Sequence, residues 1–235
     1  MQIDVEARPS YALAVVKLDK GEKIVAESSS MVAMSSGLDV DTTFNGAQGG
    51  GLVEWLTAAF VGMVRKFVAG ETMFVNEFKA KTDGQQVMLA PAMVGDLVHV
   101  TLDGTRKVVV QASSFVACTP GVKQKLIWGG IAMLFSGEGA FFLECSGKGE
   151  LLFNSYGGLE EVELDGPYVV DSGHVAAWES GSGQKLTYTL KKAGGWGTAM
   201  MSGEGFVIEF KGTGKVWLQT RNLQSLVGWI TPFFH

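Results

Sequence analysis

The sequence predicts an all-β protein built from three similar units, and three observations carry that prediction. One pattern occurs three times: a Gly-Glu pair, then an aromatic strand with a second glutamate, then a turn that contains glycine. The copies follow one another at intervals of 67 and 66 residues, and a fixed period marks a repeat architecture. The 235 residues also include 32 glycines but only 5 prolines, as short strands joined by tight turns require. The three pairs are Gly70-Glu71, Gly137-Glu138 and Gly203-Glu204.

Each Gly-Glu pair introduces a predicted β-hairpin. In the first copy Phe74, Asn76 and Phe78 share one side of a strand, because residues two apart point the same way. A turn with glycine follows at 82–84, and an apolar strand resumes at 86–89. The other copies place the turn at 146–149 and 211–214, and the second strand at 150–153 and 215–218. The sequence therefore predicts three hairpins.

An Asp-Gly turn and the strand after it form the other half of each unit. The turn at 102–104 leads into a strand at 108–110, and the turn at 164–166 leads into one at 168–170. The third copy is absent after residue 220 and occurs instead at 18–21, before a strand at 24–25. The sequence therefore predicts that the N-terminal half-unit completes the C-terminal one. Pairing of the N- and C-terminal strands would close the body with pseudo-threefold symmetry and remove exposed sheet edges.

These assignments make residues 1–235 a single domain of three pseudo-repeats. The repeats lie at about 68–127, about 134–190 and about 200–222, the last completed by about 12–38. Two segments depart from the period. Apolar residues at helical spacing predict a short helical insert near 52–67. Leu223, Leu226, Val227 and Ile230 are also spaced as in a helix, which Pro232 ends, and they predict an apolar cap packed on the body, with an oligomer contact as the alternative.

Composition and charge exclude several classes of function. The net charge of −5 and the scattered basic residues make nucleic-acid binding unlikely, because that affinity comes from neutralised phosphates. The most apolar window, 52–68, has an uncharged run of only about 10 residues, half of a bilayer span, so no transmembrane segment is expected. The chain opens with neither a signal segment nor a transit peptide. Cys118 and Cys145 lack metal or redox spacing and are expected to be buried thiols, which fits a cytoplasmic protein.

The glutamates of the repeats are the first candidate site. Glu77, Glu144 and Glu209 occupy the same place in each copy. Around a threefold axis they could hold a hard cation through oxygen ligands. Facing outward they would be solvated or pair with lysines, which is the interpretation we favour. The remaining signature residues are also expected to be structural, because glutamates at a turn accept backbone hydrogen bonds and Asp before Gly is a turn signal. They are Gly70, Glu71, Gly137, Glu138, Gly203, Glu204, Asp103 and Asp165.

Asp171 and His174 are the remaining functional candidates. With Ser172 they supply the residue types of a hydrolase triad, but neighbours along one strand point to alternate faces and cannot relay a proton. His174 aligns with the apolar Met31 and Phe115 of the other copies, which favours a buried or interfacial histidine. The chain has no nucleophile elbow, phosphate loop or metal-spaced histidine pair. The sequence therefore predicts no catalytic residue, no metal and no cofactor.

Several of these motifs occur together, in order, in one known family. The chain resembles the altered-inheritance-of-mitochondria family in its Gly-Glu strands and at 94–96, 153–158, 170–175 and 216–221. Its bacterial and archaeal members are small soluble proteins. The resemblance implies the fold of the tryptophan-RNA-binding attenuation protein, a β-sandwich or double-stranded β-helix unit that assembles into rings. Because no transit peptide is present, the resemblance points to a prokaryotic member and away from a mitochondrial role.

The function we expect is that of a non-enzymatic homo-oligomeric scaffold or binding protein. Apolar residues left on the faces of the units would drive assembly into a homotrimer or larger ring. The alternative is a ring protein that binds a small aromatic or apolar ligand between units. Trp128, Trp178, Trp196 and Trp217 are candidate walls for that ligand, although core packing explains them equally well. An enzyme of unknown class is the remote alternative.

Overall fold

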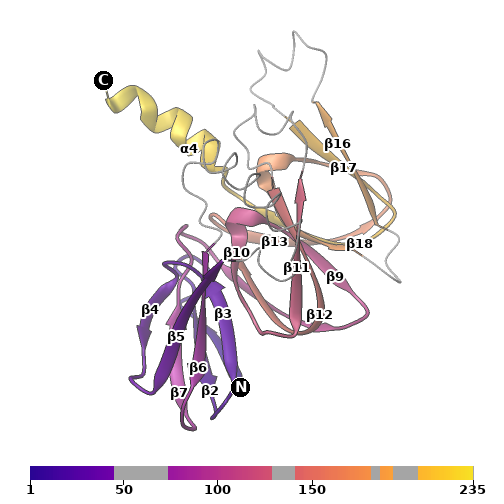
Figure 1. Ribbon diagram of the computed structural model, residues 1–235. Helices are drawn as coiled ribbons and strands as arrows, with labels where there is room; N and C mark the ends of the chain where they lie inside the picture. The colour runs from indigo at the N-terminus through magenta and orange to yellow at the C-terminus, as the bar shows by residue number, and fades with distance from the viewer. Residues whose placement is uncertain (45–73, 129–140, 181–185, 193–205, 235) are drawn as a thin grey trace, which may run out of the picture.

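The computed structural model describes residues 1–44, 74–128, 141–180, 186–192 and 206–234. These residues form β-strands, three short 3-10 helices and one C-terminal α-helix (Figure 1). The predicted all-β class is confirmed. The helix predicted near 52–67 and the three Gly-Glu pairs lie outside the described residues.

The first unit contains six strands in one continuous stretch of chain. They are β2 (Leu13–Leu18), β3 (Lys23–Glu27), β4 (Met31–Met34), β5 (Leu38–Phe44), β6 (Phe74–Ala80) and β7 (Gln85–Leu89). β7 lies between β2 and β4, whereas β6 lies between β3 and β5, and all four pairs are antiparallel. Leu18, Ile24, Phe78 and Leu89 are buried in the core of this unit. An additional strand, β1 (Gln2–Glu6), covers the outer edge of β2.

The second and third units repeat this pairing scheme. The second has β8 (Leu97–Asp103), β9 (Lys107–Gln111), β10 (Phe115–Cys118), β11 (Val122–Trp128) and the long β12 (Phe141–Asn154). The third has β13 (Leu159–Asp165), β14 (Tyr168–Asp171), β15 (Val175–Ser180), β16 (Thr187–Lys192), β17 (Phe206–Lys211) and β18 (Thr213–Gln219). β12 takes the place of both β6 and β7, since its first half pairs with β9 and β11 and its second half with β8 and β10. β17 pairs with β14 and β16, and β18 with β13 and β15.

The predicted hairpins are wrong, because the two strands of each do not pair with each other. β6 and β7 belong to different sheets, as do β17 and β18, and β12 runs through the predicted turn without a break. The glycines there make a corner at which the chain crosses from one sheet to the next. A Cβ on Gly147, whose φ is +99°, would lie 2.4 Å from the carbonyl oxygen of Gly121. Only glycine permits both that conformation and that close approach.

The predicted closure of the chain ends is also wrong. Among the described strands, β2 to β5 pair within the first unit or with β10, and β17 and β18 pair with β13 to β16. Figure 1 shows the two termini at opposite ends of the molecule. The repeats therefore lie at 13–89, 97–154 and 159–219. The spacing of the motifs is the same whether each unit begins at its hairpin or at its Asp-Gly turn. In the observed division each unit consists of segments that are neighbours along the chain, which is the usual outcome in proteins.

One strand pair joins each unit to the next. β3 pairs with β10, so that Val25 faces Cys118, and β9 pairs with β15, so that Val109 faces Trp178. We call two sets of equivalent strands the junction strands. One set is β3, β9 and β14, and the set that pairs with it is β4, β10 and β15. β4, β10 and β15 share a register shift at the same place, which confirms their equivalence. The linkers between units also touch, at an isolated bridge between Gly95 and Gly157.

An ion pair supports the linker between the first two units. Arg8 donates from Nε and Nη2 to the two carboxylate oxygens of Asp96, at 2.8 and 2.7 Å. Asp96 is buried and also accepts from the backbone N–H of Leu97 at 2.8 Å. Burial alone would raise the pKa of Asp96, but the Arg8 guanidinium and the Leu97 N–H outweigh it and hold this pKa below its ordinary value. The carboxylate is therefore ionised near neutral pH.

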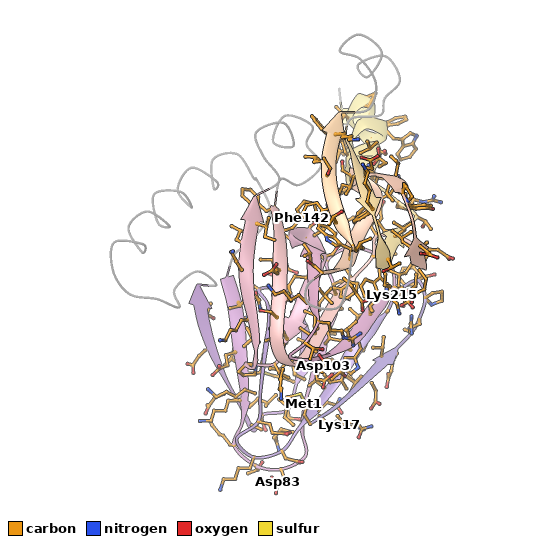
Figure 2. All side chains as sticks on the ribbon, turned by 90° about the vertical axis from the view of Figure 1, so that its right-hand side faces the viewer. Met1, Lys17, Asp83, Asp103, Phe142 and Lys215 are labelled. Carbon is orange, nitrogen blue, oxygen red and sulfur yellow. The ribbon has the colours of Figure 1, made fainter. Side chains whose placement is uncertain are left out.

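The C-terminal segment begins as predicted but does not cap the body. α4 (Leu223–Ile230) continues into a 3-10 helix, η3 (Thr231–Phe234), and neither contains a buried residue. Asn222 caps α4 through its side chain, which accepts from the backbone N–H groups of Gln224 and Ser225. The helix projects from one end of the body (Figure 1). The corners near Asp83 and Asp103 lie toward the other end (Figure 2).

Candidate functional site

The three equivalent glutamates are paired with lysines and do not form a cation site. Lys23 Nζ lies 2.6 Å from Glu77, and Lys107 Nζ lies 3.0 Å from Glu144. In the third unit Pro167 replaces the equivalent lysine, and Lys191 and Lys211 contact Glu209 instead and lower its pKa. Within the described residues no group of three or more His, Cys, Asp or Glu side chains could hold a metal. The outward, lysine-paired interpretation agrees with this geometry.

The Asp-Gly candidates lie at sheet corners. Asp103 Oδ1 accepts from the backbone N–H and the hydroxyl of Thr105, both at 2.8 Å, and from the backbone N–H of Arg106. These bonds lower the pKa of Asp103 to about 2. Asp165 ends β13 opposite Thr213. Both aspartates therefore lie at corners between sheets and not in the predicted hairpin turns.

Asp171 is the N-cap of η2 (Ser172–His174), and His174 is the last residue of η2. No hydrogen bond that could relay a proton joins these two side chains. The Asp171 carboxylate accepts from the Gly173 backbone N–H at 2.9 Å. His174 Nδ1 donates to the carbonyl oxygen of Gln219 at 2.8 Å. The common register shift aligns Val175, and not His174, with Met31 and Phe115. The predicted alignment was one residue out because it matched the Val-Ala pair at 175–176 to those at 32–33 and 116–117.

The buried thiols are also structural. Cys118 and Cys145 lie in the core of the second unit. Burial raises the pKa of the Cys118 thiol to about 12, and it raises that of Cys145 as well. Neither thiol is ionised near neutral pH.

Among the described strands, two junction strands lack a junction partner, and these form the candidate site. β4 is the last strand in the order β1-β2-β7-β4, and β14 is the first in the order β14-β17-β16. All four residues of β10 are buried, whereas all four of β4 are exposed. Val169 on β14 is 58% exposed, although its equivalent Val109 is 1% exposed. The side chains that fill an internal junction therefore face solvent at both ends of the array.

The composition of these two strands sets them apart from five of the other edge strands. β8, a further edge strand, carries Asp103 and also His99, which contacts Glu150. Each of β1, β5, β11, β13 and β16 carries two or more charged side chains, a common protection against unwanted strand pairing. β4 has the sequence Met-Val-Ala-Met and carries none. β14 carries only Asp171, whose carboxylate accepts a local backbone bond. Both strands therefore present unprotected apolar edges. The apolar runs were visible in the sequence, but the predicted closure placed residues 12–38 beside the half-unit at 200–222 and kept 168–170 inside the second repeat.

The exposed residues of the site are few and apolar. On β4 they are Met31, Val32 and Met34, and on β14 they are Tyr168 and Val169. An unpaired edge also presents free backbone N–H and C=O groups, so a strand of suitable register can extend the sheet. The arrangement suits strand addition.

Comparisons with known proteins place this architecture. Residues 3–221 match the sequence model of a family described as Mitochondrial biogenesis AIM24. An uncharacterized protein of Streptococcus pyogenes serotype M6 is 29% identical over 232 residues, which cover 97% of this chain and 89% of that protein. The crystal structure of a protein from Streptococcus pyogenes matches with a TM-score of 0.78 at 25% identity and covers 99% of both chains. The fold is therefore shared over nearly the whole length.

Proposed function

We propose, from the premise that this chain belongs to the Mitochondrial biogenesis AIM24 family, that it is a non-enzymatic scaffold which assembles head to tail. In this assembly β14 of one copy pairs with β4 of the next and forms a homotrimeric or larger ring. One observation carries the proposal: the chain uses this junction twice internally and leaves its two halves exposed and unprotected at the ends.

The internal junctions fix the register of the proposed pair. Val25 faces Cys118 at the first junction, and Val109 faces Trp178 at the second. The equivalent residues at the chain ends are Val169 on β14 and Met34 on β4. Met34 of one copy is therefore expected to face Val169 of the next, with Ala33 facing Val170 beside it.

The interface joins two different surfaces, which restricts the assemblies it can form. A head-to-tail interface makes a closed ring if the rotation between copies closes, and an open filament if it does not. It does not make a symmetric dimer through one shared patch. The use of one and the same strand pair at both internal junctions supports a regular assembly.

The residues that could have supported other functions have structural roles. Trp178 and Trp217, two of the candidate ligand walls, are buried in the cores. Trp128 and Trp196 have no described side chain. Asp171 and His174 make local backbone hydrogen bonds at η2. These contacts favour a scaffold over a ligand-binding ring or an enzyme.

The test combines two variants that each block one half of the junction. Light scattering should give a multiple of 25.1 kDa for the native protein and 25.1 kDa for both Met34→Lys and Val169→Lys. An equimolar mixture of these variants should form a 1:1 heterodimer, because one β14 and one β4 remain intact. Val40→Lys, on the exposed edge strand β5, is the matched control and should assemble normally. A native protein that stays monomeric at micromolar concentration would refute the proposal.

A further inference from the structure

The C-terminal helix presents the densest group of exposed apolar side chains in the described part of the chain. They are Leu223, Val227, Trp229, Ile230, Phe233 and Phe234. Trp229 is 67% exposed, and Phe233 and Phe234 are 71% and 76% exposed. The Trp229 and Phe233 rings contact each other with centroids 5.4 Å apart, and neither α4 nor η3 contains a buried residue. Six such side chains on twelve residues call for a partner, because large exposed apolar groups rarely persist alone.

The segment is amphipathic but has no charge. Leu223, Leu226, Val227 and Ile230 follow the spacing that places them on one face of a helix. Gln224, Ser225 and Thr231 lie outside that face. Residues 223–234 contain no Asp, Glu, Lys or Arg. A partner is therefore recognised through apolar contact alone. A partner that needs charge complementarity has nothing to bind here.

A second copy of the chain is a poor occupant for this surface. Eight helical residues span only about 12 Å, and a pair of such helices buries far less than the roughly 1,200 Å² of a stable interface. The described surface also offers no apolar area to receive the helix. Apart from α4, η3 and the junction edges, the exposed large apolar residues are Met1, Tyr11, Val40, Val94 and Tyr188, from five different segments.

We propose that α4 and η3 form an interfacial anchor that inserts into the surface of a zwitterionic lipid bilayer. Trp and Phe prefer the boundary between headgroups and acyl chains, and an amphipathic helix lies in that plane with its apolar face about 5–10 Å deep. Among the described residues no helix is long and apolar enough to cross a bilayer. The net charge of −5 opposes anionic lipids and selects a zwitterionic surface.

The direction of α4 suits this role. The helix leaves the body at the end opposite the corners near Asp83 and Asp103 (Figures 1 and 2). In the head-to-tail ring, on which this one step rests, cyclic symmetry would point every α4 to the same side. Several weak anchors would then engage one membrane together, and their joint binding would exceed that of a single copy. The anchor itself does not require the ring.

The test uses the full-length protein and phosphatidylcholine vesicles in a flotation assay. The triple variant Trp229→Ser, Phe233→Ser and Phe234→Ser should lower the partition coefficient at least about tenfold, because it removes most of the inserted aromatic surface. A matched triple variant, Tyr11→Ser, Val40→Ser and Val94→Ser, removes exposed apolar side chains elsewhere and should bind as the native protein does. Added phosphatidylglycerol should weaken binding, and salt should restore it.

A spectroscopic measurement identifies the inserted residue. Brominated phosphatidylcholine should quench part of the tryptophan fluorescence of the native protein, and Trp229→Phe should remove that quenching while the protein still floats. Val169→Lys separates this proposal from the proposed ring: a monomer that still binds vesicles, more weakly than the native ring, supports the anchor. Failure of the native protein to float would overturn the anchor. So would equal flotation of the two triple variants, or loss of oligomer mass in the Trp229 triple variant without loss of flotation.

Discussion

Trp178 on β15 and Met34 on β4 hold the same place in two units, yet Trp178 is 1% exposed and Met34 is 42% exposed. The strand pairing within each unit is the same, but the surroundings differ. Trp178 packs against Tyr188 and Phe210 of its own unit and Phe142 of the second, and β15 has β9 beside it, whereas β4 has no junction partner among the described strands. Both strands nevertheless keep an apolar sequence, whereas the edge strand β13 carries Glu160, Glu161, Glu163 and Asp165. An apolar edge among charged ones is the feature on which the proposed pairing of β4 with β14 rests.

The largest expected effect breaks the internal junction. Trp178 packs against Phe142, Tyr188 and Phe210 with ring centroids 5.0, 4.8 and 5.8 Å apart. Trp178→Ala should therefore lower the free energy of unfolding by about 3–5 kcal/mol. Met34→Ala, compared in the monomeric Val169→Lys background, should lower it by less than about 1 kcal/mol, because it removes an exposed side chain. Urea denaturation of the two variants gives both values. Equal losses would mean that β4 is buried within the monomer after all.

A smaller effect concerns the linker between the first two units. Asp96→Asn removes the ion pair with Arg8, and we expect a loss of about 1 kcal/mol, since the Arg8 side chain is half exposed and solvent screens it. The folded pKa of Asp96 is lowered, so its contribution is complete above the unfolded pKa near 3.9 and disappears as pH falls through the folded pKa.

Thermal unfolding of native protein and Asp96→Asn from pH 7 to pH 2 measures this dependence. The gap between the two should stay constant down to about pH 5 and shrink below about pH 4. Asp83→Asn is the control, because Asp83 lies at an exposed corner of the first unit, away from the linkers. A gap that grew toward low pH would contradict the assigned role of Asp96.

The smallest expected effect distinguishes the outer junction from the inner one by salt. Arg106 Nη1 contacts the buried Glu179 at 3.1 Å across the junction between the second and third units. The equivalent residues at the chain ends are Gly166 and Ser35, which carry no charge. Oligomer mass should therefore be the same in low and high salt, apart from a slight gain from screened net charge. Dissociation by salt alone would show that charged residues outside β4 and β14 hold the copies together.

The sequence predicted the class of the fold and the position of most strands, because alternation and Asp-Gly turns are local signals. It could not predict the phase of the repeat, since residues 45–73 separate β5 from β6 and made the N-terminal strands look unpartnered. The glycine corners were predicted as hairpins. Whether two successive strands pair depends on tertiary contacts such as the close approach of Gly147 to Gly121, which no local pattern records. The exposure of Met34 depends on whether another strand lies beside β4, which no periodicity records.

The continuity of each unit along the chain has a consequence during synthesis. Because β2 to β7 pair among themselves, the first unit can complete its sheets before the second has left the ribosome, and domains fold in that order as chains emerge at about 5–20 residues per second. β4 is then ready while β14 of the same molecule does not yet exist. For several seconds the nascent chain can accept a strand only from a finished molecule. The first contact between copies is therefore expected to form on the translating ribosome, with a mature protein as the donor of β14.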